Sequence, residues 1–112
     1  MKGSDVSVKH LQRALTMELT TVNTYLYQER RLNDWGVDRL AKRMREETEE
    51  ERGHADRFLT RLLFLEGEAD VSTLDPIHPP ESVRQIFETQ HAMEKEAVSY
   101  YNQAARECHE AG

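Results

Sequence analysis

Glu51 and His54 form a Glu-x-x-His pair, which is the pattern in this sequence most suited to metal chemistry. On a helix, a spacing of three places both side chains on one face, where they can hold the same ion. Glu18 and Glu94 lie on or beside the apolar stripes of two other segments, and a buried carboxylate costs several kcal/mol unless a cation or strong donors offset it. Carboxylate oxygen with imidazole nitrogen suits iron, manganese or zinc. The four residues Glu18, Glu51, His54 and Glu94 therefore predict a metal site.

Tyr25 lies seven residues after Glu18, on the same face of a helix. It can approach a metal as a hydrogen-bond or electron donor, or it can be a packed core tyrosine, and the sequence leaves both interpretations open. The acidic run 46–51 is typical of a solvated helix face, which is the interpretation for Glu46, Glu49 and Glu50. Glu18 alone would be more typical of a salt bridge beside the apolar stripe. Only its combination with the other three residues favours a role as a metal ligand.

These side chains must be positioned by three long amphipathic helices, expected at about 5–34, 38–66 and 82–109. Apolar residues recur at intervals of three and four in each segment. Gly36 and Gly67 are C-cap signals for the first two helices, and Ser82 is a candidate N-cap for the third. The short turn at Gly36 predicts an antiparallel hairpin.

All three prolines, Pro76, Pro79 and Pro80, lie in the segment 68–80. Because proline cannot continue a helix, this segment is expected to be a long crossover between the second and third helices. The sequence thus predicts a single all-α domain over residues 1–112, built as an antiparallel helical bundle.

Composition narrows the function further. The 112 residues carry a formal net charge of −6, which argues against nucleic-acid binding and suits cations. No apolar run approaches the roughly 20 residues of a membrane span, and the N-terminus lacks the apolar segment of a signal peptide. The lone Cys108 excludes an internal disulfide and fits a reducing compartment. We therefore expect a cytoplasmic protein.

The ordered motifs of this chain resemble those of the bacterioferritins over nearly its whole length. They are Met1-Lys2-Gly3, Glu18-Leu19 with Asn23 and Tyr25, Asp34-Trp35-Gly36, the segment from Glu51 to Asp56, and the segment from Leu63 to Gly67. The resemblance implies a ferritin-like subunit that oxidises iron(II) with oxygen or peroxide and stores iron mineral in a 24-subunit shell. It also implies a di-iron ferroxidase centre with Glu18, Glu51, His54 and Glu94 as ligands and Tyr25 beside it.

The chain departs from this family at two places. Arg52 stands where haem-binding members carry a methionine, and a guanidinium cannot serve as a soft axial ligand, which argues against haem binding. The sequence ends at Gly112, before the family's fourth bundle helix and its second Glu-x-x-His. The expectation is a truncated or split subunit, with an apolar groove that a separate C-terminal fragment would fill.

Two alternatives to a ferroxidase stay open. A non-catalytic subunit would hold one divalent ion through the same four residues, and oxygen consumption on adding ferrous iron separates it from an enzyme. A purely structural helical assembly would satisfy its carboxylates with Arg and Lys, and would keep full thermal stability after chelation. Homo-oligomers are expected, as dimers or a larger shell, and Tyr27, Trp35 and Tyr100 are candidates for contacts between subunits.

Overall fold

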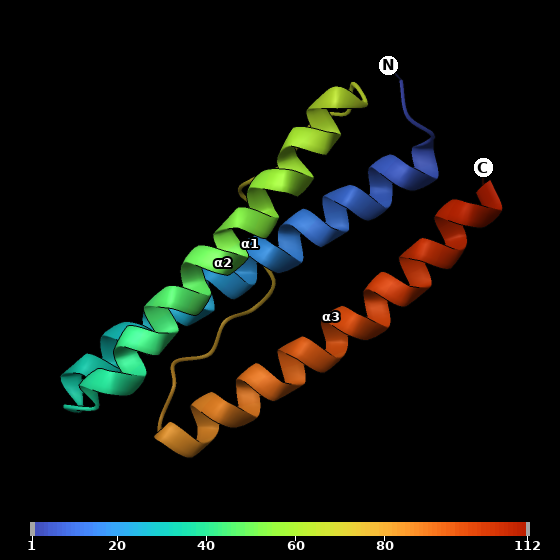
Figure 1. The fold of residues 1–112 in the computed structure, drawn as a ribbon. Coiled ribbons are helices and arrows are strands. Elements are labelled where there is room, and N and C mark those ends of the chain that lie inside the picture. The colour runs from blue at the N-terminus through green and yellow to red at the C-terminus, as the bar shows by residue number, and fades with distance from the viewer. Residues whose placement is uncertain (1, 112) are drawn as a thin grey trace.

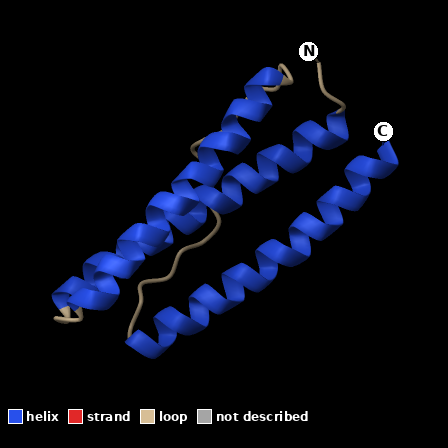
Figure 2. Cartoon of the chain, in the orientation of Figure 1, coloured by secondary structure: helices blue, strands red, loops and turns tan. Residues whose placement is uncertain are grey.

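The computed structural model describes residues 2–111 and contains three helices: α1 (Asp5–Asp34), α2 (Asp38–Phe64) and α3 (Val83–Ala111) (Figure 1). The described residues form no strand, as Figure 2 shows, so the predicted all-α fold class is confirmed. The molecule measures 49 × 22 × 20 Å. The second helix ends two residues before the expected position 66, and the third runs two residues beyond the expected 109.

α1 and α2 form an antiparallel hairpin (Figure 1). The hydroxyl of Ser4 caps α1 by accepting from the backbone N–H of Ser7 at 3.1 Å. At the other end Gly36 takes a left-handed conformation with φ 77°, and the N–H of Val37 donates to the carbonyl of Leu32 at 2.9 Å. The predicted C-cap at Gly36 is therefore confirmed, since this backbone conformation favours glycine.

The end of α2 differs from the prediction in its local geometry. Glu66, and not Gly67, takes the left-handed conformation, with φ 61°. Gly67 donates its N–H to the carbonyl of Leu62 at 2.9 Å, and a Cβ at Gly67 would lie 3.1 Å from Cγ1 of Val8. The tight spacing at Gly67 thus comes from its approach to α1 and not from its own φ angle.

The connection between α2 and α3 runs back along the whole hairpin, so that α3 starts beside the α1–α2 turn and lies antiparallel to α1 (Figure 1). Two contacts hold this connection to α1. Arg13 donates two hydrogen bonds to the carboxylate of Asp75, at 2.8 and 2.9 Å. The side-chain amide of Gln12 pairs with the backbone of Asp70 at 2.9 and 2.8 Å. Ser82 then caps α3, since its hydroxyl accepts from the N–H of Gln85 at 3.1 Å.

The core is built around α1, which packs against both other helices. α2 and α3 lie farther apart and meet through long side chains, such as the rings of Phe58 and Tyr101, whose centroids are 5.9 Å apart. Two clusters of buried residues lie along the hairpin, and the first also takes in a residue of α3. The one near the turn contains Tyr25, Leu32, Ala41, Met44 and Ile86, and the one near the chain's N-terminal end contains Leu15, Ala55 and Leu62.

The face of α1 toward α3 is more polar than its apolar stripe predicted. Leu26 of α1 and Phe87 of α3 belong to the apolar repeats of their helices, yet they are 47% and 51% exposed. Thr20, Thr24 and Gln28 are buried instead. This polar face matters for the site because it continues directly from Glu18 along α1.

Candidate metal centre

Three of the four predicted ligands come together at mid-height of the bundle. Glu18 projects from α1, and Glu51 and His54 project from α2; one ligand atom from each residue lies within 4.8 Å of the other two. The Nδ1 atom of His54 is 3.2 Å from Oε2 of Glu51 and 3.9 Å from Oε1 of Glu18. The spacing of three therefore places Glu51 and His54 on one helix face, as expected from the sequence.

The neighbouring core sets the register that brings these residues together. Leu15 on α1 packs with Ala55 and Leu62 on α2 in a single buried cluster. Glu18 lies about one helical turn from Leu15, and His54 precedes Ala55, so apolar packing on one side of the site fixes the height at which the carboxylates and the imidazole meet.

Glu18 has the most unusual environment in the group, with only 6% of its surface exposed. Its Oε1 atom accepts a hydrogen bond from the hydroxyl of Tyr101 at 2.6 Å, whereas its Oε2 atom is buried and has no hydrogen-bond partner among the described residues. Burial, and next the adjacent Glu51, raise the pKa of Glu18 to about 7, against the opposing effects of Tyr101 and His54. A divalent cation would both neutralise this carboxylate and give Oε2 its missing partner, so the residues fit a metal.

Tyr101 is a site residue that the sequence prediction missed. Burial, together with its hydrogen bond to Glu18, raises its pKa well above the ordinary value of 10.0, so the phenol stays protonated and donates to the carboxylate. The available signal was its position on the stripe of the third helix, seven residues after Glu94 and therefore on the same helix face.

Glu94 and Tyr25 border the same cavity as the three clustered residues, a space of about 260 Å³. Glu94 is exposed, and its carboxylate does not belong to the group whose ligand atoms lie within 4.8 Å. Tyr25 is 2% exposed, and burial followed by the carboxylate of Glu51 raises its pKa above the ordinary value. Tyr25 thus packs in the core and also borders the site, while its role as a hydrogen-bond or electron donor stays a prediction.

The remaining candidates lie outside the group. Arg52 is exposed, with its guanidinium 4.0 Å from Glu49. A second Glu-x-x-His, formed by Glu88 and His91 on α3, is also exposed and does not join the clustered residues. Tyr27 and Trp35 are exposed, whereas the hydroxyl of Tyr100 lies 2.6 Å from Nδ1 of His10 within the chain; a role of these three residues in subunit contacts stays a prediction.

Comparisons with known proteins agree with this architecture. The sequence profile of the ferritin-like domain matches residues 8–112. The bacterioferritins of Rhodobacter capsulatus and Brucella melitensis are 40% and 38% identical over 112 residues, which is all of this chain and 70% of each relative. The solved R. capsulatus bacterioferritin, described with a metal-free dinuclear site and haem iron, superposes with a TM-score of 0.96 over all of this chain and 70% of that one. In the described part of the chain, none of the helices has the length and apolar character needed to cross a membrane.

Proposed function

Because this chain belongs to the bacterioferritin family of ferritin-like proteins, we propose that it is an iron-storage subunit that oxidises iron(II) to iron(III). The observation that carries this proposal is the buried, unpartnered Oε2 atom of Glu18 beside Glu51 and His54. A carboxylate in that position is costly in the empty protein and is stabilised by a divalent ion, which is the expected character of a site for ferrous iron.

In this proposal the protein binds and orients iron, its substrate, and iron redox supplies the chemistry. Glu18, Glu51 and His54 hold a ferrous ion, and Glu94 approaches from α3 across the same cavity. Two ferrous ions each give up one electron, and the oxidant, oxygen or peroxide, takes up the pair. A Glu-x-x-His on a fourth helix, in the same protein or on a separate fragment, completes the two-ion centre, and subunits assemble into a shell. Arg52 supplies no haem ligand.

A non-catalytic site that holds one ion without Glu94 is a narrower form of the first alternative, and one feature favours it. The three clustered residues are enough to hold a single ion, while Glu94 stays outside their group. The structural alternative has less support. It requires buried carboxylates to be paired with Arg or Lys, and this is true of Glu29 but not of Glu18. Glu29 is 4% exposed and is paired with Arg45, whereas Glu18 faces a tyrosine and a histidine.

The deciding experiment adds ferrous iron to the metal-free protein in aerated buffer and records oxygen consumption and ferric absorbance. We expect oxidation faster than in protein-free buffer, and loss of that acceleration in Glu18→Gln. The matched control is Glu46→Gln, because Glu46 is exposed on α2. Iron binding without oxygen consumption would leave the non-catalytic alternative, and an unchanged rate in Glu18→Gln would remove this site from the reaction.

A further inference from the structure

A second group of interacting side chains lies near the N-terminal end of α1, where α3 packs against it. The hydroxyl of Tyr100 is 2.6 Å from Nδ1 of His10, and Nε2 of the same imidazole is 2.5 Å from a carboxylate oxygen of Glu107. The side chain of His10 is largely enclosed, at 14% exposed, whereas that of Glu107 reaches the surface, at 44% exposed. A phenol, an imidazole and a carboxylate are therefore joined in one row.

The order of these three groups assigns their protons. A carboxylate only accepts hydrogen bonds, so Nε2 of His10 carries the ring proton and Nδ1 is an acceptor. Burial raises the pKa of Tyr100 above its ordinary value of 10.0, so the phenol keeps its proton near neutral pH and donates it to Nδ1. Glu107 thus orients the imidazole as a base toward Tyr100, which is the arrangement of hydroxyl, base and orienting group that enzymes use to remove a proton.

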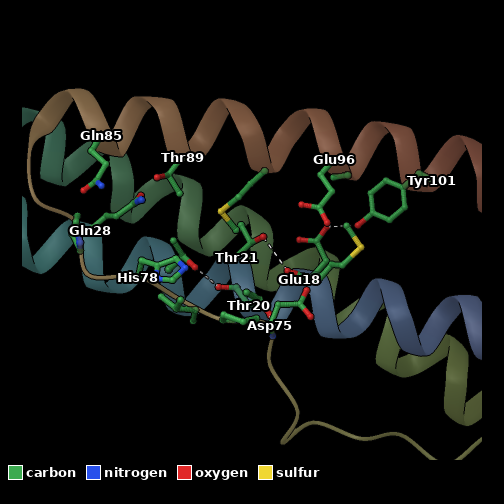
Figure 3. A pocket seen from close by; sticks show the side chains of 17 residues that line it. Glu18, Thr20, Thr21, Gln28, Asp75, His78, Gln85, Thr89, Glu96 and Tyr101 are labelled. Carbon is green, nitrogen blue, oxygen red and sulfur yellow. Dashed lines mark hydrogen bonds between the residues drawn. The ribbon is translucent and has the colours of Figure 1, made fainter.

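Tyr100 is also connected to the metal centre through its neighbour in the sequence. The hydroxyl of Tyr101 donates to Oε1 of Glu18 at 2.6 Å (Figure 3). The rings of Tyr100 and Tyr101 meet edge to face with centroids 6.1 Å apart, and the centroids of Tyr100 and His10 are 5.6 Å apart. A continuous row of aromatic rings therefore leads from the carboxylate of Glu18 to the surface at Glu107.

The number of electrons available at the metal group gives this row a chemical use. The three clustered ligands are enough to hold a single ferrous ion, and one ferrous ion supplies one electron. Hydrogen peroxide takes up two electrons to become two hydroxide ions. With only one electron it splits into a hydroxide ion and a hydroxyl radical, which damages protein. A second electron donor within the chain would complete the reduction.

A phenol is suited to be that donor when a base is in contact with it. Loss of an electron makes the phenolic O–H strongly acidic, so oxidation is much easier when a hydrogen-bonded base accepts the proton in the same step. Tyr100 has this base in Nδ1 of His10. Tyr101 instead donates to Glu18, a carboxylate whose negative charge a bound ion would neutralise. The hydrogen bonds thus single out Tyr100 as the residue to be oxidised.

We propose that Tyr100 is a redox-active tyrosine that supplies the second electron when a single ferrous ion at the metal centre reacts with hydrogen peroxide. The inference rests on the proposed function and adds an electron donor to it. The ferrous ion gives one electron and becomes ferric, and the phenol of Tyr100 gives the other through the ring of Tyr101. The O–O bond of the peroxide breaks and yields two hydroxide ions. The phenolic proton moves to Nδ1 of His10, which leaves a neutral tyrosyl radical beside an imidazolium that Glu107 stabilises.

The test adds one equivalent of ferrous iron per chain to the metal-free protein without oxygen, and then one equivalent of hydrogen peroxide. Electron paramagnetic resonance of rapidly frozen samples counts tyrosyl radicals, and absorbance counts ferric ions. Tyr100→Phe removes the proposed donor, and His10→Gln keeps a hydrogen-bonding side chain that is not a base. Tyr25→Phe tests the tyrosine that borders the metal cavity, and the matched control is Tyr27→Phe, at a residue that is 41% exposed. Circular dichroism verifies that each variant folds.

We expect a tyrosyl radical in the wild type and in Tyr27→Phe, loss of most of that signal in Tyr100→Phe, and a several-fold smaller signal in His10→Gln. A radical that persists in Tyr100→Phe and disappears in Tyr25→Phe would overturn the inference and assign the electron to Tyr25. Ferric iron without any tyrosyl radical in the wild type would also overturn it, while the proposed function would stand. If the wild type forms ferric iron no faster than protein-free buffer, the proposed function fails, and the inference fails with it.

Discussion

The two oxygens of Glu18 have different surroundings, and this difference predicts how the residue affects stability. Burial and Glu51 raise the pKa of Glu18 from 4.5 to about 7. The free energy of unfolding is therefore highest below pH 4.5, where the carboxyl is neutral in both states, and it falls as the pH rises through about 7. In the metal-free protein, Glu18→Gln should therefore become increasingly more stable than wild type across this interval. Urea unfolding at several pH values measures the difference, with the exposed Glu46→Gln as control.

A constant difference between wild type and Glu18→Gln over the same pH range would contradict this prediction. Divalent ions should reverse the order above pH 7, because they bind the wild-type carboxylate more tightly than the neutral glutamine and stabilise the state that binds them.

Tyr101 gives the second prediction at this scale. Tyr101→Phe removes the hydroxyl that donates to Oε1 of Glu18 at 2.6 Å, and leaves both oxygens of a buried carboxylate without a donor. We expect the free energy of unfolding of the metal-free protein to fall by about 1–3 kcal/mol, as for other buried groups left unsatisfied. The comparison is Tyr27→Phe, at a residue that is 41% exposed, where a change within about 0.5 kcal/mol is expected. Equal losses in the two variants would exclude this role for the Tyr101 hydroxyl.

The sequence predicted the local part of the site and missed the part made across the bundle. Glu51 and His54 are joined by the helical repeat alone, so their proximity follows from spacing. The partnership of Glu18 with Tyr101 depends on how α3 is placed against α1, which no periodic pattern specifies. The same reason explains why Glu94, correctly placed on the third helix, stays outside the group formed by the other three.

Within the elements, two glycines of different surroundings should respond in opposite ways to alanine. Gly53 lies inside α2 with open space where a Cβ would stand, so Gly53→Ala should raise the free energy of unfolding by about 1 kcal/mol through helix propensity. Gly67→Ala should lower it, because its Cβ would lie 3.1 Å from Cγ1 of Val8. Urea unfolding of both metal-free variants tests the pair. If both substitutions raise the free energy of unfolding, the side chain of Val8 can shift away from the new methyl group at position 67 without destabilising the protein.

The connection between α2 and α3 contains its own pH-dependent contact. Asp70 accepts hydrogen bonds from the hydroxyl of Thr73 and from Ser72, which lower its pKa to about 2. The stability it contributes is present above its ordinary pKa of 3.8 and is lost as the pH falls through about 2. We expect Asp70→Asn to lower the thermal midpoint near neutral pH and to match wild type near pH 2. The exposed Asp56→Asn is the control, and a deficit independent of pH would assign the effect to something other than the charge.

Helix ends were predictable where one residue type determines the geometry. Gly36 ends the first helix in the conformation that glycine permits, as its position indicated. At the second helix the left-handed residue is Glu66, one position before the predicted glycine, and Gly67 instead lies where a Cβ would come 3.1 Å from Cγ1 of Val8. Close approach between distant segments is a tertiary property, so the sequence pattern could not separate these two causes.

At the scale of the whole molecule, the helices should differ in their protection from hydrogen exchange. α1 buries residues along most of its length, whereas Ile86 is the one α3 residue that is fully buried. Amides of α3 should therefore exchange through local opening faster than those of α1 and α2. Co²⁺ should slow exchange mainly in α1 and α2, which carry the three clustered ligands, and should have no effect in Glu51→Gln. Equal protection in all three helices would contradict this arrangement.

The bundle itself was predictable because its rules are local. A short turn specifies the hairpin, and a proline-rich segment of this length requires a crossover. The central position of α1 was not predictable, because its contact face toward α3 is built from Thr20, Thr24 and Gln28, which resemble surface residues in sequence. These polar residues are buried only because α3 packs over them, which is a tertiary contact that the local pattern does not specify.

The shared carboxylate of Glu18 makes metal affinity and helix docking reciprocal quantities. Its Oε1 atom ties α3 to α1 through Tyr101, and the same carboxylate borders His54 on α2. If a bound ion strengthens the association of α3 with the hairpin by some factor, docking of α3 must raise the affinity for the ion by the same factor. Both equilibria belong to one thermodynamic cycle. In a subunit built this way, an ion bound at Glu18 would change how firmly α3 docks on α1, and docking of α3 would change the affinity for that ion by the same factor.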